Sequence, residues 1–172
     1  MKIFPRFLES SVVIAVIIAD QITKLAVQKY MSLYESFEVI KGCFNITYIL
    51  NRGAAFGILS NLSPSIRKPF FIIISLTALG LIIYLLSETN KKNRLLRISY
   101  GMILAGASGN LIDRIFMGEV RDFLDFYWKS YHWPAFNIAD SSICIGTVIL
   151  ILSIFFTSEA VENNNNNQHG SS

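Results

Sequence analysis

The sequence predicts a membrane protein of the all-α class, with four transmembrane helices. Of its 172 residues, 52% are hydrophobic and only 16% are charged, which is fewer charges than soluble domains carry. The mean hydropathy is +0.46. The apolar residues also gather in long blocks separated by polar stretches, which is the pattern of membrane-spanning helices rather than of a globular core.

We expect a single membrane domain over residues 1–157, because this length suits one domain. The predicted helices cover about residues 7–27, 69–86, 95–113 and 136–156. The first apolar block is longer than a signal peptide allows and has no clean small-residue cleavage site, so we expect it to remain as a helix. The last segment, 158–172, is polar and rich in asparagine, and its composition predicts a disordered tail.

A mixed segment at about residues 37–60 has the pattern of β-structure. From Phe44 to Asn51, apolar residues alternate with largely polar ones, a period of two that is typical of strands. We therefore expect a small sheet on the membrane surface. The following residues, Asn51 to Gly57, combine small residues with an amide, a guanidinium and an aromatic ring. Such a loop suits the close approach of a ligand backbone, and it suits an ordinary turn equally well.

The basic residues indicate the orientation in the membrane. The short segment between the second and third helices holds the densest basic cluster, and the positive-inside rule works best on short loops. This cluster and the basic residues near the N-terminus predict that both termini are cytoplasmic. The residues concerned are Lys2, Arg6, Lys91, Lys92, Arg94 and Arg97. The opposite side also carries basic residues, so the bias is one of density and not of number.

Several functional classes are excluded by composition. The two cysteines, Cys43 and Cys144, fall in a polar segment and in a predicted helix, so we expect no disulfide between them. The only histidines are His132 and His169, which excludes a His-Glu-x-x-His zinc site, and we expect no metal or cofactor. The basic residues form no stripe of the kind that binds nucleic acid.

Acidic and amide residues gather between the last two apolar blocks, from Asp113 to Asp140. Ionisable groups at membrane depth are costly, so they are functional candidates by default. Two carboxylates held close together cannot both ionise cheaply, and such a pair shares one proton. The charged member can activate water while the protonated member polarises a carbonyl, as in aspartic peptidases. We hypothesise that Asp122 and Asp140 form such a pair.

Spacing alone leaves the partner of Asp140 open among Asp113, Asp122 and Asp125. Asp113 adjoins Arg114, and we expect an ion pair with a structural role between them. Asp125 could be simply solvated, so Asp122 ranks first by a narrow margin. Asp140 lies near the start of its predicted helix, where the helix dipole favours an anion. We therefore expect Asp140 to ionise more readily than Asp122.

Two helical patterns support the same region. Gly106, Asn110 and Asp113 are spaced four and then three apart, which places them on one face of the third helix, and Gly106 permits close packing there. On the first helix, Asp20 and Lys24 are four apart with the acid first, the favoured order for an ion pair. The pattern predicts a structural pair, which is compatible with a role in supporting the site.

Two rival functions are weaker. Gly106-Ala107-Ser108-Gly109 is similar to the motif of serine intramembrane peptidases, but such a serine needs a histidine on another helix. His132 falls in a loop and His169 in the tail. A transporter or scaffold that uses the acids as an ion site is the other rival, and four short helices without an inverted repeat argue against it.

Five blocks of the sequence, in order and at matching spacing, resemble the signatures of the bacterial lipoprotein signal peptidases (signal peptidase II). They are Asp20-x-x-x-Lys24, Asn51-x-Gly53-Ala54-Ala55-Phe56, Gly109-Asn110-Leu111-Ile112-Asp113-Arg114, Val120-x-Asp122-Phe123 and Phe136-Asn137-Ile138-Ala139-Asp140-Ser141. The resemblance covers nearly the whole chain except the tail. It implies a four-helix peptidase of the bacterial inner membrane, with a small extracytoplasmic β-cradle, a short periplasmic helix and an active site near the extracytoplasmic face.

The resemblance also implies the substrate and the roles of individual residues. The family removes the signal peptide from prolipoproteins just before a cysteine that carries a diacylglyceryl group, and globomycin is its inhibitor. Asp122 and Asp140 would be catalytic, and no cofactor is implied. The residues implied to bind substrate are Asn51, Gly53, Asn110, Arg114 and Asn137, with Asp20, Lys24 and Asp113 in support. We expect the enzyme to act as a monomer among membrane lipids.

Overall fold

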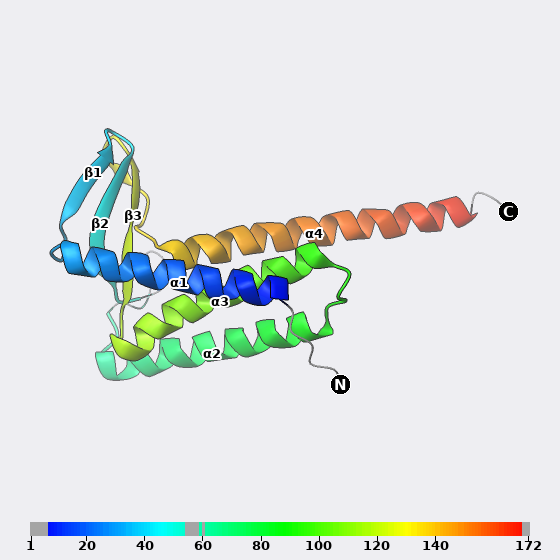
Figure 1. Cartoon of the computed structure of the whole chain (residues 1–172), viewed down its shortest axis with the longest axis horizontal. Helices are drawn as coiled ribbons and strands as arrows, with labels where there is room; N and C mark the ends of the chain where they lie inside the picture. Colours follow the sequence, from blue (N-terminus) through cyan, green and yellow to red (C-terminus); the bar gives the residue numbers. More distant parts are fainter. Residues whose placement is uncertain (1–6, 54–58, 60, 170–172) are drawn as a thin grey trace.

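The computed structural model describes residues 7–53, 59 and 61–169, and it describes the side chains of residues 10–156 within these ranges. Four long helices dominate it, as predicted (Figure 1). They are α1 (Phe7–Tyr30), α2 (Pro64–Glu88), α3 (Arg94–Phe116) and α4 (Ile138–His169). All four are long and apolar enough to cross a membrane, over Ser10–Tyr30, Pro64–Glu88, Arg94–Phe116 and Ile138–Phe156.

Helix α3 is the centre of the bundle. It packs against α1, α2 and α4, and half of its most apolar window is buried, against 11% to 22% in the other three helices. Aliphatic side chains around the outside, such as Ile14, Ile73 and Ile154, are more than half exposed. The largest fully buried side chains are instead polar or charged. The bundle is therefore apolar outside and polar within, which suits hydrocarbon as the surrounding solvent.

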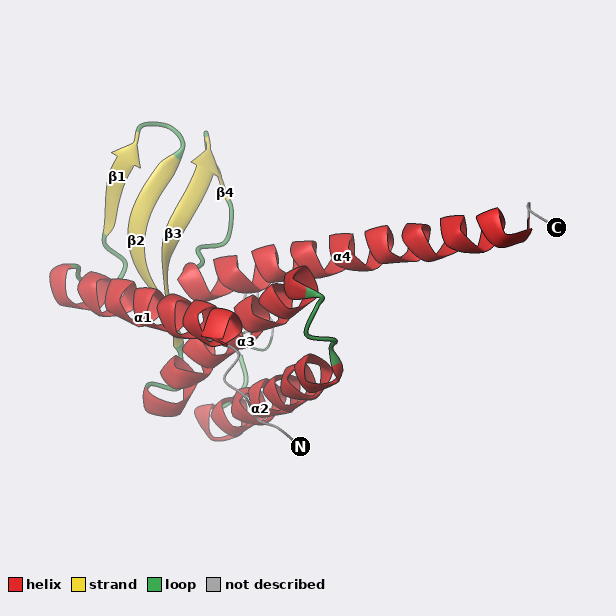
Figure 2. Cartoon of the chain, turned by 45° about the vertical axis from the view of Figure 1, so that its right-hand side comes forward, coloured by secondary structure: helices red, strands yellow, loops and turns green. Residues whose placement is uncertain are grey.

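A four-stranded antiparallel sheet lies at one end of the bundle, with the turn between α2 and α3 at the other end (Figures 1 and 2). The strand order is β1 (Ser36–Ile40), β2 (Phe44–Asn51), β3 (Val120–Trp128) and β4 (Tyr131–His132). The predicted strand over residues 44–51 is confirmed as β2. Strand β3 was not predicted, because its first four residues are all buried and their sequence does not alternate between apolar and polar.

The helix ends differ from the prediction at two places. Helix α2 begins at Pro64 and not near Pro69, because Pro64 itself occupies the first turn, where proline is well tolerated. Helix α4 continues to His169, through the segment for which the composition predicts disorder. No proline or glycine stands between Gly146 and Gly170 to end the helix earlier.

Two further expectations concern a short periplasmic helix and the loop after β2. Outside the four long helices, the described residues form strands and connections, so the short periplasmic helix implied by the resemblance is not found among them. The Asn51–Gly57 loop is described only as far as Gly53, and the remainder of that prediction lies outside the described residues.

Helix α3 approaches both α4 and α1 closely at glycines. A Cβ on Gly106 would overlap the carbonyl oxygen of Ala139, and a Cβ on Gly109 would lie 2.6 Å from a carboxylate oxygen of Asp20. A Cβ on Gly146 would lie 2.9 Å from the carbonyl oxygen of Ser99. Small residues of this kind let transmembrane helices pack without a hydrophobic driving force. The expected packing role of Gly106 is confirmed.

Gly106→Ala should therefore destabilise the protein by about 1–3 kcal/mol, because the added methyl group forces α3 and α4 apart at the start of α4. Thermal unfolding of the purified protein in detergent measures this effect. Gly80→Ala is the matched control: among the described residues, no atom apart from its chain neighbours and the backbone of α2 lies within 4 Å of a Cβ at Gly80, so this change should be neutral or slightly stabilising. Equal melting temperatures for Gly106→Ala and the wild type would contradict the close packing.

Candidate active site

The polar residues predicted from the sequence meet at the end of the bundle that carries the sheet. A cavity of about 500 Å³ opens there between the end of β2, the start of β3, the C-terminal half of α3 and the start of α4. Its polar lining includes both Asp122 and Asp140, and its apolar lining includes Phe136 and Ile145. The other lining residues are Asn51, Gly53, Asn110, Arg114, Val120, Trp133, Pro134, Ala135, Ser141 and Cys144.

Three asparagines donate hydrogen bonds to the two carboxylates. Asn51 Nδ2 lies 3.0 Å from Asp122 Oδ2, and Asn137 Nδ2 lies 2.7 Å from Asp122 Oδ1. Asn110 Nδ2 lies 2.7 Å from Asp140 Oδ1. A carboxylate can accept several such bonds at once, and each one favours its charged form.

The orientation of each amide is fixed by a partner that can only donate. The Oδ1 atom of Asn51 accepts from the backbone N–H of Gly53 at 3.0 Å, and that of Asn137 accepts from the backbone N–H of Asp140 at 2.9 Å. The Oδ1 atom of Asn110 accepts from Lys24 Nζ at 3.0 Å. With each oxygen committed to a donor, the NH₂ groups must face the carboxylates.

The first turn of α4 builds part of the site by itself. The Asn137 side chain accepts from the N–H of Asp140, and the Asp140 carboxylate accepts from the N–H of Asn137 at 3.3 Å. This reciprocal pattern is a capping box, which satisfies backbone donors that a helix start leaves unpaired. Asp20 of α1 accepts a hydrogen bond from another backbone donor of this turn, the N–H of Ala139, at 2.9 Å. The same bonds that begin the helix therefore hold Asp140 in place.

Asp122 is an unusual carboxyl group. It is 2% exposed, and burial together with the negative charge of Asp140 raises its pKa to about 7 from an ordinary value of 3.8. The hydrogen bonds from Asn51 and Asn137 act in the opposite direction and offset only part of this rise. The group therefore holds its proton at pH values at which an ordinary aspartate is fully ionised.

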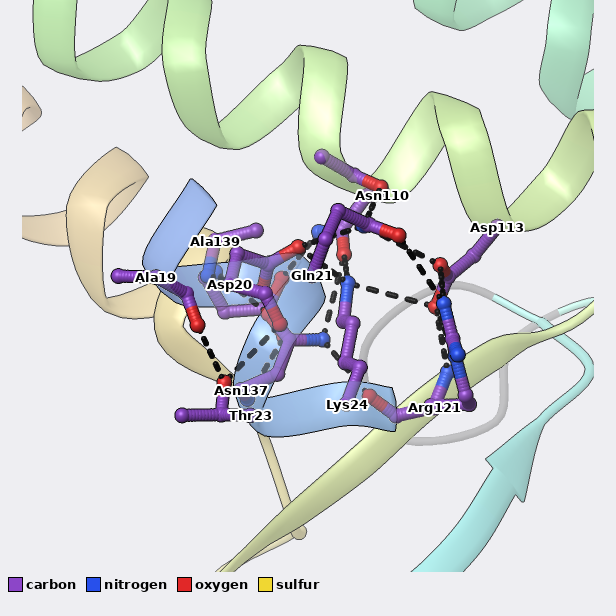
Figure 3. Close-up of polar contacts among 12 residues, drawn as sticks. Ala19, Asp20, Gln21, Thr23, Lys24, Asn110, Asp113, Arg121, Asn137 and Ala139 are labelled. Atoms are coloured by element: carbon purple, nitrogen blue, oxygen red, sulfur yellow. Dashed lines mark hydrogen bonds and ion pairs between the residues drawn. The ribbon is translucent and has the colours of Figure 1, made fainter. Parts of the chain in front are cut away.

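Behind the cavity lies a buried cluster of charges (Figure 3). Lys24 Nζ lies 2.9 Å from Asp20 and 3.4 Å from Asp113, and all three side chains have no exposed surface. The ion pair predicted from the spacing of Asp20 and Lys24 is thus confirmed. Arg121, which the sequence did not single out, completes the cluster by pairing with Asp113 at 2.6 Å. The four charges balance, as buried charges must.

Two expectations about the competing acids are wrong. Asp113 does not pair with Arg114, because consecutive residues of a helix do not face each other. Arg114 instead lines the cavity, with its guanidinium carbon 5.3 Å from the centre of the Phe71 ring. Asp125 is not solvated: it is 7% exposed and bonds to Asn45 at 3.0 Å and to His132 at 2.9 Å.

The serine alternative finds no support in this arrangement. Ser108 is not among the residues that line the cavity, and His132 is bonded to Asp125 on the sheet. The cysteines Cys43 and Cys144 are free, as expected. Among the described residues, no group of three or more histidines, cysteines or acids is arranged to hold a metal ion.

The fold and the site define a class: a multi-pass membrane protein with one buried and one half-buried carboxyl group at the edge of a largely apolar cavity. A family profile described as "Signal peptidase (SPase) II" matches residues 12–156. The chain belongs to the signal peptidase II family, whose members are aspartic peptidases. The resemblance drawn from the five sequence blocks is confirmed.

Known relatives are close over most of their length. The chain is 48% identical over 145 residues to the lipoprotein signal peptidase of Geobacter sulfurreducens, covering 84% of this chain and 89% of the relative. It is 43% identical over 138 residues to that of Haemophilus influenzae, covering 80% of each chain. A solved structure titled "Bacterial membrane enzyme structure by the in meso method at 2.3 A resolution" matches with a TM-score of 0.82 at 36% identity, covering 90% of this chain and 92% of that chain.

The raised pKa of Asp122 predicts a pH-dependent stability. In the unfolded chain this carboxyl loses its proton near its ordinary pKa of 3.8, whereas in the folded protein it holds it up to about 7. Its contribution to stability is therefore complete below about pH 4 and is lost as the pH rises through 7. The Asp122→Asn variant should not lose this stability as the pH rises, because an amide side chain does not titrate. The stability of the variant relative to wild type should rise by on the order of 2 kcal/mol between pH 5 and pH 8.

Thermal or denaturant unfolding in detergent at the two pH values measures this difference. The comparison between variant and wild type cancels the titration of groups that do not interact with Asp122, whereas the titration of Asp140, whose charge acts on Asp122, contributes to the difference. An equal difference at pH 5 and pH 8 would show that Asp122 has an ordinary pKa in the folded protein.

Proposed function

We propose that the chain removes the signal peptide from diacylglyceryl-modified prolipoproteins, cleaving just before the lipidated cysteine, with Asp122 and Asp140 as the catalytic pair. The observation that carries this proposal is the position of Asn137, which donates to Asp122 through its side chain and to Asp140 through its backbone. One residue thus holds both carboxyl groups at the edge of the same cavity. Membership of the signal peptidase II family supports the substrate class.

In the proposed mechanism the two acids take different parts. Asp140 is ionised, because it lies in the first turn of α4 and accepts hydrogen bonds from Asn110 and from a backbone N–H. It takes a proton from water as the water oxygen attacks the scissile carbonyl. Asp122 is protonated and gives its proton to the carbonyl oxygen, which produces a tetrahedral diol. As the diol collapses, Asp122 takes a proton back from one of the two hydroxyl groups, the C–N bond breaks and the departing amine receives the proton from Asp140.

Arg114 is proposed to bind the substrate backbone. Its guanidinium group faces the cavity and packs on the Phe71 ring, and it makes no hydrogen bond to another described residue. Its N–H groups therefore remain available for peptide carbonyls, which need polar partners where water is scarce. Asn51, Gly53 and Asn110 line the cavity beside it and complete the proposed substrate site.

The apolar part of the cavity suits a substrate that arrives from the bilayer. Phe136, Cys144 and Ile145 line it, and Ile145 is 51% exposed on the outside of the bundle. A diacylglyceryl group can stay in the hydrocarbon while the peptide enters between the polar residues. We propose that globomycin occupies the same cavity, and that the enzyme acts as a monomer because all ten predicted site residues come from one chain.

The proposed orientation places the sheet and the site on the extracytoplasmic side of the bacterial inner membrane, with both termini in the cytoplasm. The basic turn between α2 and α3 lies at the end of the bundle opposite to the sheet (Figure 1). It contains Lys91 and Lys92, and the positive-inside rule assigns it to the cytoplasm.

Replacing either acid should abolish catalysis. Asp122→Asn and Asp140→Asn should each lower kcat by at least about a thousandfold. The first variant lacks the proton donor and the second lacks the ionised base. The measurement is cleavage of a diacylglyceryl-modified prolipoprotein by the purified variants. Asp125→Asn is the matched control on the same strand, and it should keep kcat within about threefold. Turnover near the wild-type rate in either dyad variant would refute the mechanism.

The orientation can be tested with the native cysteines. In a Cys144→Ser variant, Cys43 in the exposed turn between β1 and β2 is the remaining thiol. It should react with a membrane-impermeant maleimide added to intact spheroplasts. In a Cys43→Ser, Cys144→Ser background, Lys92→Cys should react only after the membrane is permeabilised. The reverse pattern of labelling would invert the proposed topology.

A further inference from the structure

Arg121 is a buried charge that the proposed mechanism does not use. It precedes Asp122 on β3, and consecutive residues of a strand point to opposite faces. Asp122 faces the cavity, so Arg121 faces away from it, toward α1 and α3. The residue is only 5% exposed. An arginine at this position needs a partner for every nitrogen, because an unpaired buried charge is very costly.

The guanidinium group has such partners on two helices. Its Nη2 atom lies 2.6 Å from Asp113 Oδ1 and 3.1 Å from Gln21 Oε1, and its Nη1 atom lies 2.9 Å from Gln28 Oε1. Its Nε atom lies 3.3 Å from Asp113 Oδ2. Gln21 and Gln28 are seven residues apart and so lie on one face of α1. Arg121 therefore connects β3 to α1 and to α3 at once.

The backbone of Arg121 is held as firmly as its side chain. Its N–H donates to Asp113 Oδ2 at 3.0 Å, and its carbonyl oxygen accepts from Asn137 Nδ2 at 3.3 Å. Asn137 is the same residue that caps α4 and donates to Asp122. The position of β3 at residue 121 is thus coupled directly to the group that holds both acids.

The pairing of β3 with β2 is interrupted directly after Asp122. Val120, Arg121 and Asp122 lie opposite Asn51, Leu50 and Ile49, and the next pair is Leu124 with Ile46, so two residues of β2 stand against one of β3. The extra residue makes this a bulge in β2, and a bulge interrupts the ladder of backbone hydrogen bonds. Three residue pairs hold the start of β3 to β2 on this side of the bulge. The side-chain contacts of Arg121 add to the constraint that this short stretch of ladder supplies.

We propose that Arg121 is a positioning residue for the reaction. By connecting β3 to Asp113, Gln21 and Gln28, it holds the backbone of β3 in the position that brings Asp122 to the cavity beside Asp140. This proposal rests on the proposed function of Asp122. Arg121 does not touch the cavity, so it acts on catalysis only through Asp122 and Asn137.

The alternative is that Arg121 only stabilises the fold, and melting temperatures alone cannot separate the two roles. Removing it leaves Asp113 paired with Lys24 alone, which lowers stability in either case. Two milder variants distinguish them. Arg121→Lys keeps the charge but cannot reach Asp113, Gln21 and Gln28 together. Gln28→Leu removes one connection of α1 to β3 without changing any charge.

Kinetics of cleavage provide the test. If Arg121 positions Asp122, Arg121→Lys should lower kcat about 10- to 100-fold and Gln28→Leu about 3- to 10-fold, with KM changed by less than about threefold. Arg121→Met should be at least as impaired as Arg121→Lys. The matched control is Arg97→Met, since Arg97 is also a buried arginine but donates to Leu86 and Thr89 at the far end of the bundle. It should lower the melting temperature and leave kcat per folded enzyme unchanged.

The pH profile gives an independent readout. The charged groups around Asp122 are Asp140 from α4, Lys24 from α1 and Arg114 from α3. Burial and Asp140 raise the pKa of Asp122, so a displacement of β3 away from Asp140 lowers it. Gln28→Leu should move the alkaline limb of the kcat profile to lower pH by about half a unit or more. Since this variant changes no charge, the shift cannot come from a lost Coulomb interaction.

Wild-type kcat and a wild-type alkaline limb in both Arg121→Lys and Gln28→Leu would overturn the proposal, whether or not Arg121→Met folds. The dyad variants separate this failure from a failure of the proposed function. If Asp122→Asn keeps its activity, the catalytic role of Asp122 is wrong. If Asp122→Asn is inactive while Arg121→Lys and Gln28→Leu match the wild type, only the positioning role of Arg121 is wrong.

Discussion

The rest of the structure depends on one fully buried ammonium group, that of Lys24. An ammonium can only donate, and in a membrane-spanning helix no water surrounds it to accept. Its Nζ atom is within 3.4 Å of three acceptors, on Asp20, Asn110 and Asp113. Two of these acceptors come from α3 and one from α1 itself. The charge of Lys24 therefore fixes how α1 and α3 must meet, and helix packing follows from it.

The charge of Lys24 also determines which atoms face the cavity, because each hydrogen bond needs one donor and one acceptor. Lys24 takes the oxygen of Asn110, which turns the NH₂ group of Asn110 toward Asp140. Asp20, held by Lys24, accepts the N–H of Ala139 and so holds the first turn of α4. Both routes end at the same carboxylate. A cluster that looks structural thus determines which atoms the cavity presents, because every group in it has a fixed donor or acceptor sense.

The local part of this network could be predicted from the sequence. The spacing of Asp20 and Lys24 predicted their ion pair, since residues four apart share a helix face. Asn137 and Asp140, three apart at the start of an apolar block, have the spacing of a capping box, although we predicted no cap there. The four helices followed from hydropathy in the same way. In each case the interacting groups are neighbours along the chain, so one structural period relates them.

The long-range part could not be predicted. Arg121 bonds to Gln21 and Gln28, about a hundred residues earlier in the sequence, and no periodicity relates them. Asp113 was assigned to the wrong arginine for a similar reason. Arg114 is its neighbour along α3 but points elsewhere, whereas Arg121 returns to it after the chain reverses at Gly118, which has a positive φ of 78°. Strand β3 was missed because residues of both its faces are buried.

The proposed mechanism assigns different protonation states to the two acids, and their different structural origins support this assignment. In the proposed mechanism Asp140 belongs to a helix start, where backbone N–H groups and the helix dipole favour negative charge. Asp122 belongs to a strand, which has only a small dipole, and its hydrogen-bond donors among the described residues are neutral side-chain amides. With 2% exposure and a charge nearby, its proton is retained to a pH of about 7. In this proposal, the asymmetry that acid–base catalysis requires comes from the two secondary-structure elements, and Asn137 contacts both acids.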